Sequence, residues 1–311
     1  MKLKPLTPDG RPEGRILAYC LLALAALFFA LNTNIARASA DEVPPLALTF
    51  WRLFLSILIL APFTVRNCWN SWSLIRENFW LLNLLAALQM TVFNALVYSG
   101  LNYTQAINGN LLQGAFPICV LVASVIFVRQ RITFWQWIGV LLGLAGLVWI
   151  VIRGEPARLL ALEVNLGDPL VFLGVFSSAT YAAILFKRPK EIALTPFIFL
   201  LLVLGAVQIF PFYLWEHFTQ RSLPMTHTAI GAVLSIAVFA SVLAQIFFAE
   251  GIRRVGAPTG GNIIYLTPVF GVIIAITLLG ETFQFFHAVG ILLIALGIWF
   301  AMFIGKKPNT T

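Results

Sequence analysis

Charged residues are scarce in this chain. Only 10% of its 311 residues are Asp, Glu, Lys or Arg, whereas a soluble domain carries about 25%. Hydrophobic residues make up 60% of the chain, and the mean hydropathy is +0.93. A water-soluble globule cannot bury so much apolar surface, so we expect lipid to be the solvent. The segments between the long apolar runs are short, which leaves no room for a soluble domain.

Cysteine and histidine are also rare, with three of each. Cys20, Cys68 and Cys119 lie far apart, and their odd number and lack of motif spacing argue against a disulfide framework or a metal site. The sequence contains no nucleotide-binding loop, so ATP-driven pumping would need another chain. We therefore expect no metal and no cofactor.

Acidic side chains are missing from the middle of the apolar runs. Of the 12 Asp and Glu residues only Glu250 lies at the edge of a run, while Asp168 and His287 are expected at run ends. An enzyme acting on lipids would need a nucleophile with a base, or metal ligands, at membrane depth. A lipid-modifying enzyme is therefore the least favoured function. The same absence favours facilitated diffusion or exchange over proton antiport through Glu250.

Ten apolar runs are each long enough to cross a bilayer as a helix, which takes about 20 apolar residues. The first run is too long for a signal-peptide core and lacks a clear cleavage site, so we expect it to be retained. The predicted fold is an all-α integral membrane protein with ten transmembrane helices. The predicted spans are approximately Arg15–Ile35, Leu46–Val65, Phe79–Ser99, Ala106–Val128, Phe134–Ile152, Asp168–Phe186, Thr195–Trp215, Thr228–Ala249, Pro258–Leu279 and Phe283–Ile304.

The basic residues lie almost entirely on one side of these spans. Fifteen Lys and Arg residues fall on the side of the two termini, four fall on the other side, and Arg52 lies inside a span. This bias follows the positive-inside rule and predicts that both terminal tails, 1–14 and 305–311, are cytoplasmic. The net charge of +8 thus reflects membrane topology and does not indicate binding of nucleic acid.

A repeat with an offset of 151 residues runs through the sequence. The stretch AINGNLLQGAFP, which ends at Pro117, matches APTGGNIIYLTP, which ends at Pro268. Two pairs of glycines in the last span of each copy match at the same offset. The repeat unit contains five spans, at 15–152 and 167–304. Because five is odd, the two copies have opposite orientations, and such inverted repeats are typical of secondary transporters.

Three stretches form recognisable span motifs, LFFALNTNIAR, PPLALTFWR and YLTPVFGVIIAITLLGE. They resemble the EamA-like bacterial branch of the drug/metabolite transporter superfamily, although Gln130 stands where that family often has Glu. The resemblance implies a secondary transporter of the bacterial inner (cytoplasmic) membrane that exports small polar metabolites, such as amino acids or related compounds, by alternating access. A multi-span channel or a sensor is the alternative. The expected partners are a small-molecule solute and the lipid bilayer, and a homodimer stays open.

The repeated stretches place polar side chains in the middle of apolar helices. Asn110, Gln113 and Pro117 share one helix face, and Asn262 and Tyr265 precede the matching proline in the second copy. Both prolines are predicted helix kinks, because proline lacks the N–H that the helix needs. An unsatisfied polar group facing lipid is costly, so these faces must turn toward protein or a watery cavity. They either line a solute path or pack helices together.

Arg52 is the most unusual of the polar residues, roughly 10 Å inside the second span. An ionisable residue in the membrane is a functional hypothesis by default, and a buried guanidinium can receive a carboxylate through two parallel hydrogen bonds. The alternative is that it snorkels to the surface or ties down a neighbouring helix. The predicted solute-contacting residues are Asn32, Trp51, Arg52, Gln89, Asn94, Tyr98, Asn110, Gln113, Tyr181, Gln245, Asn262 and Tyr265.

Overall fold

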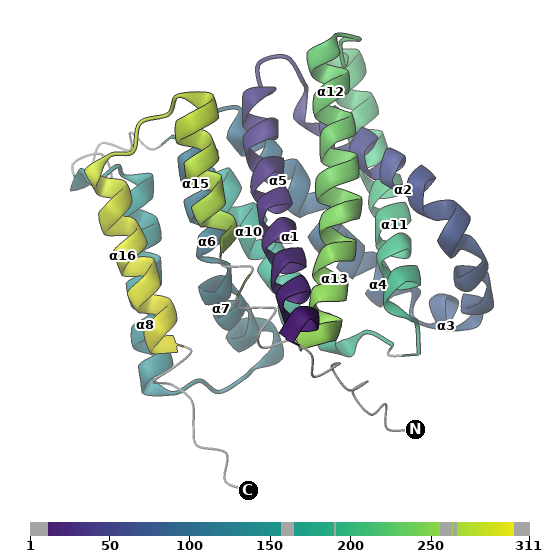
Figure 1. Cartoon of the computed structure of the whole chain (residues 1–311), viewed down its shortest axis with the longest axis horizontal. Coiled ribbons are helices and arrows are strands. Elements are labelled where there is room, and N and C mark those ends of the chain that lie inside the picture. Colours follow the sequence, from purple (N-terminus) through teal and green to yellow (C-terminus); the bar gives the residue numbers. More distant parts are fainter. Residues whose placement is uncertain (1–11, 157–164, 190, 256–262, 264–265, 302–311) are drawn as a thin grey trace, which may run out of the picture.

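The computed structural model describes residues 12–156, 165–189, 191–255, 263 and 266–301. Within these ranges every regular element is a helix, and the helices stand side by side in one bundle (Figure 1). The elements are α1 (Pro12–Ala38), α2 (Pro45–Asn70), α3 (Trp72–Glu77), α4 (Phe79–Ala86), η1 (Ala87–Val92), α5 (Phe93–Leu101), α6 (Ala106–Gly114), α7 (Phe116–Val128), α8 (Phe134–Val151), α10 (Gly167–Ile184), η2 (Leu185–Lys187), α11 (Leu194–Thr219), α12 (His227–Ser235), η3 (Ile236–Leu243), α13 (Ala244–Val255), α15 (Leu266–Leu279) and α16 (Phe285–Trp299).

Seven helical stretches in the described ranges are long and apolar enough to cross a membrane, and an eighth results if α6 and α7 count as one span. The prediction of ten spans is therefore met only in part. The fourth run is not one straight helix, because α6 and α7 meet at 49° around Ala115. The last two runs are described only at 263 and over 266–279 and 283–301, and the helices α15 and α16 within them are shorter than a full span.

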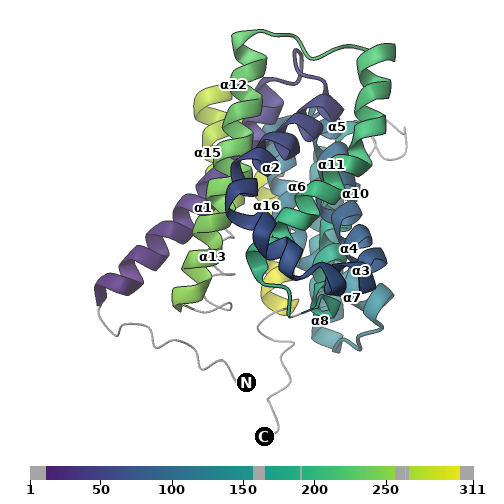
Figure 2. The same cartoon turned by 90° about the vertical axis from the view of Figure 1, so that its right-hand side faces the viewer.

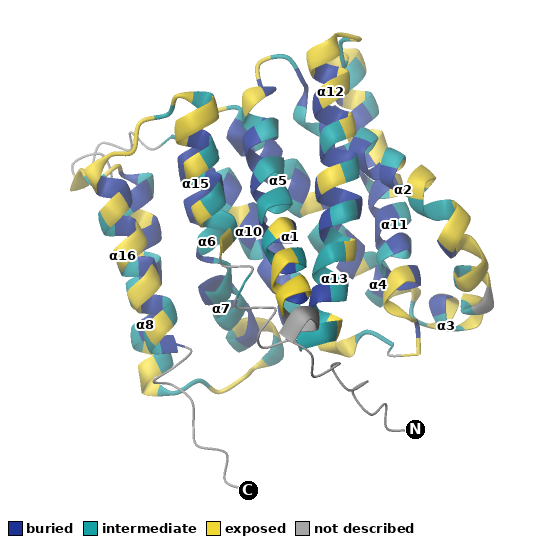
Figure 3. Cartoon of the chain, viewed as in Figure 1, coloured by how far each residue is buried: buried dark blue, intermediate teal, exposed yellow. Residues whose placement is uncertain are grey.

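Exposed residues follow the outer side of the helices (Figure 3), and many of them are large and apolar. Phe63, Trp80 and Phe285, for example, are 78%, 81% and 81% exposed. Such a surface is unfavourable in water, whereas lipid tails are as apolar as these side chains. The outer surface therefore suits a bilayer, as the composition predicts.

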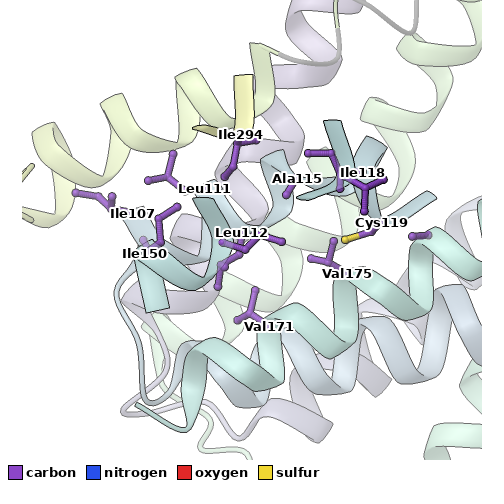
Figure 4. Close-up of a cluster of buried hydrophobic side chains, with 14 of the residues drawn as sticks. Ile107, Leu111, Leu112, Ala115, Ile118, Cys119, Ile150, Val171, Val175 and Ile294 are labelled. Atoms are coloured by element: carbon purple, nitrogen blue, oxygen red, sulfur yellow. The ribbon is translucent and has the colours of Figure 1, made fainter. Parts of the chain in front are cut away.

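The helices pack in a set of pairs that spans the whole bundle. α8 packs on α16, α2 on α11, α5 on α10 and α1 on α13, and the turned view shows α13 beside α1 (Figure 2). One apolar core lies where α6, α7, α8, α10 and α16 meet, with Ile107, Ile118, Ile150, Val171 and Ile294 among its side chains (Figure 4). These contacts fix the positions of the helices around the centre of the bundle relative to one another.

Two pairs of glycines bring α8 and α16 into close contact. A methyl group on Gly139 would lie 2.5 Å from the carbonyl oxygen of Gly297, and one on Gly146 would lie 2.9 Å from that of Gly290. Backbone carbonyls cannot move aside as flexible side chains can. Small residues at such positions let two helix backbones approach in a membrane, so these four glycines set the distance between α8 and α16.

Two complete π-helical segments lie in the described part of the chain. η1 interrupts the span that contains α4 and α5, and η3 interrupts the span that contains α12 and α13. The offset of 151 residues maps Leu88 in η1 onto Phe239 in η3. Single π-helical turns inside α-helices occur frequently at functional sites, and both segments border the cavity described below.

Two carboxylates cap helices that lie far away in the sequence. Glu216, near the end of α11, accepts hydrogen bonds from the amides of Leu46 at 3.2 Å and Ala47 at 2.8 Å, at the start of α2. Glu281, after α15, accepts bonds from the first two amides of α6, each at 2.8 Å. These amides have no partner inside their own helix, and the helix dipole favours a negative charge beside them. Each glutamate therefore ties two helix ends together.

The glycine contacts predict a stability difference between two Gly→Ala variants. Gly139→Ala should destabilise the protein by about 1–3 kcal/mol, because the added methyl group would collide with the backbone of α16. Gly231→Ala in α12 is the matched control, since no atom lies within 4 Å of an added methyl group there. Thermal unfolding of the purified proteins in detergent measures the difference. Equal unfolding midpoints for the two variants would contradict the tight α8–α16 contact.

Candidate functional site

A cavity of about 360 Å³ lies between the helices, within the range of about 300–1,000 Å³ that is usual for small-molecule sites. Its lining comes from α1, α2, α5, α6, α7, α10, α11, α13, α15 and the two π-helical segments. None of the described lining residues belongs to α8 or α16. The polar lining residues are Asn32, Arg52, Gln89, Asn94, Gln113, Ser178, Ser241, Gln245 and Thr267.

Arg52 carries the positive charge of this lining. Its side chain is only 7% exposed, and its Nη1 donates a hydrogen bond of 2.8 Å to the hydroxyl of Tyr98. The guanidinium carbon also lies 5.6 Å from the centre of the Tyr98 ring. Its Nε has no hydrogen-bond partner, and no carboxylate of the described residues lies within ion-pairing distance. The cavity thus holds a buried cation without a counter-ion in the described part of the chain.

A short chain of hydrogen bonds fixes Arg52 relative to two other helices. The Tyr98 hydroxyl accepts the bond from Arg52 and donates one of 2.7 Å to Oδ1 of Asn32. Tyr98 is 2% exposed and belongs to α5, while Asn32 belongs to α1. Side-chain entropy is therefore already lost before a solute binds, and the guanidinium is preorganised toward the cavity.

The amide side chains around the cavity use only part of their hydrogen-bonding capacity. Oε1 of Gln89 accepts a 2.7 Å bond from Ser178, and Nε2 of Gln113 donates one of 3.0 Å to Thr33. Nδ2 of Asn94 donates to the carbonyl of Met90 at 2.7 Å inside the π-helical region. Each amide has a donor and an acceptor end. Because one end of each is bonded within the protein, the other can serve a solute.

Half of the predicted solute-contacting residues line this cavity, and Pro117 and Pro268 line it as well. Pro117 is the second residue of α7, directly after the 49° bend, and an added methyl group on Gly114 would lie 3.1 Å from Cγ of Pro268. The two proline-containing helices therefore meet at the cavity. The lining residues from the predicted set are Asn32, Arg52, Gln89, Asn94, Gln113 and Gln245.

The other predicted contacts lie elsewhere. Tyr98 is behind the lining, where it holds Arg52. Trp51 packs against the rings of Phe50, Phe54 and Tyr213, and Tyr181 packs against an apolar core.

Asn110 also lies outside the lining. Its Nδ2 donates to its own helix, at the carbonyl of Ala106, while its amide fits against Gly271, where a side chain would collide with it. Asn110 therefore packs α6 on α15. Asn262 and Tyr265 lie outside the described residues.

Much of the cavity wall is apolar and was not singled out by the sequence. The buried hydroxyl of Thr267, which has no hydrogen-bond partner, was missed too, although a hydroxyl inside an apolar run is a visible signal. The apolar residues carry no such signal, because a side chain facing lipid and one facing the cavity look alike in the sequence. Among them are Phe29, Met90, Phe93, Phe116, Ile198 and Phe248.

The chain is similar to a family and to proteins of bacteria and archaea. The model of the EamA-like transporter family matches residues 16–152 and, a second time, residues 165–303. "Uncharacterized transporter YyaM" of Bacillus subtilis (strain 168) is 25% identical over 297 residues, which cover 94% of this chain and 95% of that protein. An "Uncharacterized transporter" of Archaeoglobus fulgidus is 27% identical over 292 residues, which cover 90% of this chain and 96% of that protein.

A solved crystal structure of a protein has a similar fold. Its TM-score to this chain is 0.59, with 15% sequence identity, and the match covers 93% of this chain and 99% of that chain. At this identity the likeness concerns the fold alone.

Proposed function

The chain belongs to the EamA-like transporter family, and from this premise we propose that it is a secondary transporter that exports small, carboxylate-bearing polar metabolites. Transport of a small solute across a lipid bilayer follows from the family and from the apolar helices. Amino acids and related compounds are the class that fits the cavity chemistry. No ATP-binding element is needed, because a solute that accumulates inside flows outward down its own gradient.

The observation that carries this proposal is the unpaired charge of Arg52. Burying a charge without a partner is costly, and a protein keeps such a group where function requires it. A solute carboxylate would supply the missing negative charge and can accept two parallel hydrogen bonds from a guanidinium. The amide and hydroxyl groups of Gln89, Gln113 and Ser241 would then hold an ammonium or another polar group of the solute.

We further propose that the protein consists of two inverted five-helix repeats, 15–152 and 167–304, that move by alternating access. At the offset of 151 residues, Gly139 corresponds to Gly290 and Gly146 corresponds to Gly297. The contact between Gly139 and Gly297 therefore has a counterpart between Gly290 and Gly146, and the structure contains both contacts. The same offset maps η1 onto η3, α1 onto α10 and α5 onto α13. The packing of α1 on α13 therefore has its counterpart in the packing of α10 on α5. The cavity lies between the halves, where inverted-repeat transporters place the solute.

Facilitated diffusion or exchange is the mode of transport that the cavity favours. Its described lining contains no Asp, Glu or His, so it has no group that would take up a proton as the site changes sides. Glu250, the other candidate from the sequence, forms ion pairs with Arg253 at 2.6 Å and Arg254 at 2.7 Å at the end of α13. These ion pairs hold Glu250 ionised, so it is not the proton carrier.

Substitution of Arg52 tests the proposed solute site. A strain lacking the protein, screened on toxic amino acids and analogues with intracellular pools measured, first identifies a transported solute. Arg52→Gln removes the charge, and Arg52→Lys keeps the charge but loses the planar fork. We expect Arg52→Gln to lower transport at least tenfold and Arg52→Lys to lower it less, because a charge-assisted hydrogen bond contributes about 1.5–3 kcal/mol.

Arg66→Lys is the matched control, because Arg66 is exposed near the end of α2. The expression level of each variant and its elution profile in size-exclusion chromatography show whether it is folded. Wild-type transport rates in folded Arg52→Gln and Arg52→Lys would mean that Arg52 does not bind the solute.

Single cysteines test the proposed location of both termini in the cytoplasm. The start of α1 and the end of α16 lie at the same end of the bundle, together with α3 (Figure 1). Glu77 in α3 and Ser222, between α11 and α12, are both exposed. In a variant without Cys20, Cys68 and Cys119, an impermeant maleimide added to intact cells should label Ser222→Cys and leave Glu77→Cys unlabelled. Labelling of Glu77→Cys alone would reverse the orientation.

A further inference from the structure

A buried cluster of polar side chains lies outside the cavity, where α6, α10 and α16 begin. Asp168 and His287, expected at the exposed ends of apolar runs, are both 0% exposed. Asp168 accepts hydrogen bonds from the hydroxyl of Thr104 at 2.5 Å and from Nδ2 of Asn108, which lies 3.3 Å from each carboxylate oxygen. Oδ1 of Asn108 lies 3.0 Å from Nε2 of His287. The cluster therefore joins three helices through two ionisable groups and one amide.

The hydrogen bonds fix the protonation state of His287 in this arrangement. The backbone N–H of Gln284 donates to Nδ1 of His287 at 2.9 Å, so Nδ1 carries no proton. Nε2 then carries the proton and donates it to Oδ1 of Asn108, whose Nδ2 in turn donates to the carboxyl group of Asp168. The bond from Gln284 also caps the start of α16. The neutral imidazole thus holds both the helix cap and the link to α6.

We propose that the chain Asp168–Asn108–His287 is a proton-binding site, and that a proton taken up there releases the start of α16 from α6 and α10. A hydronium ion transfers its proton to Nδ1 of His287, which leaves a water molecule and an imidazolium. Nδ1–H would then face the N–H of Gln284, so two donors oppose each other and the cap must break. A positive charge at a helix N-terminus is also unfavourable.

The surrounding charges set how readily this proton binds. Asp168 is joined to the imidazole through Asn108, and a negative charge there would favour the proton, whereas the positive charge of Arg153, after α8, would oppose it. Glu281 is engaged in capping α6, and Glu155 near Arg153 has interactions of its own. Tyr103, after α5, contributes its backbone carbonyl to Asn165 and is 64% exposed. Among the described residues, Asp168 is therefore the carboxylate that hydrogen bonds connect to the imidazole, by way of Asn108.

The position of the cluster makes the proton a regulator and not a transported ion. None of its residues lines the cavity. Asn108 precedes the lining residue Gln113 by five positions in α6, or roughly 7.5 Å, and Asp168 precedes Val175 by seven in α10, or roughly 10 Å. Loosening these helix starts therefore acts on the frame of the cavity. With the topology proposed above, this end faces away from the cytoplasm, so external pH is what the site would sense.

His287→Gln is the matched variant, because the protein contains the same cap with glutamine. At the start of α8, Oε1 of Gln136 accepts a 2.8 Å hydrogen bond from the amide of Thr133, in the place that His287 has relative to Gln284. A glutamine at 287 can keep the cap and donate to Asn108, but it cannot take up a proton. The variant therefore separates loss of the proton site from loss of the structure.

Hydrogen–deuterium exchange of the full chain in nanodiscs tests the proposal between pH 8 and pH 4. The exchange rate of the peptide that contains Gln284 to His287 is divided by the exchange rate of the peptide at the start of α8. This ratio cancels the dependence of the chemical exchange rate on pH. On acidification this ratio should rise about tenfold in the wild type, as expected for the loss of one buried hydrogen bond, and stay constant in His287→Gln. Identical pH profiles for the two proteins would overturn the proposal.

Asp168→Asn tests the role of the carboxylate and guards against misfolding of the first variant. Asparagine keeps the size and an acceptor oxygen but removes the charge that attracts the proton. The rise in exchange should therefore occur at lower pH than in the wild type. A rise at the same pH would show that His287 titrates alone and would remove Asp168 from the site. Thermal unfolding at pH 8 confirms that both variants are folded.

Discussion

Inside a bilayer every polar group needs a partner within the protein, because lipid offers none. Helices meet this constraint for the backbone, and most buried side chains of this protein meet it with a carbonyl of their own helix or with a neighbouring helix. Arg52 departs from it, since its buried guanidinium faces the cavity and no carboxylate of the described residues lies within ion-pairing distance. Removing the partner of a buried charge costs about 3–5 kcal/mol. A bound anion would recover part of that free energy, which ties solute affinity to this one side chain.

The rest of the bundle divides into tight and adaptable parts around this charge. Close contacts between glycines hold α8 against α16, and none of the described residues that line the cavity belongs to these two helices. The α8–α16 pair therefore lies outside the cavity wall. The cavity is instead bordered by π-helical segments, a bend at Ala115 and two prolines, all of which weaken the regular helix ladder. The irregular helices are thus the ones that would move if the protein works by alternating access, as proposed, whereas the glutamate caps and the glycine contacts would keep the other helix ends in place.

The sequence predicts the helices well, because long apolar runs have few alternatives in lipid. It also singles out Arg52, Gln113 and Pro117, which line the cavity, since polar residues and prolines are conspicuous in such runs. It does not reveal that Trp51 and Tyr181 pack against other side chains outside the cavity lining, because the rotation of a helix about its axis depends on its neighbours and a membrane helix is apolar on every side. The sequence also does not predict that Asp168 and His287 are buried. Both lie at the ends of apolar runs, and they are covered because they pack against Asn108 of α6.

The central claim is that Arg52 binds the carboxylate of the solute, and binding to the purified protein tests it most directly. Thermal unfolding would be measured with a panel of amino acids, each compared with its carboxamide, which has the same shape without the negative charge. The account predicts that at least one amino acid raises the unfolding temperature of the wild type, that its carboxamide does not, and that Arg52→Gln abolishes the increase. An equal increase with the carboxamide, or an increase that survives in Arg52→Gln, would contradict the account.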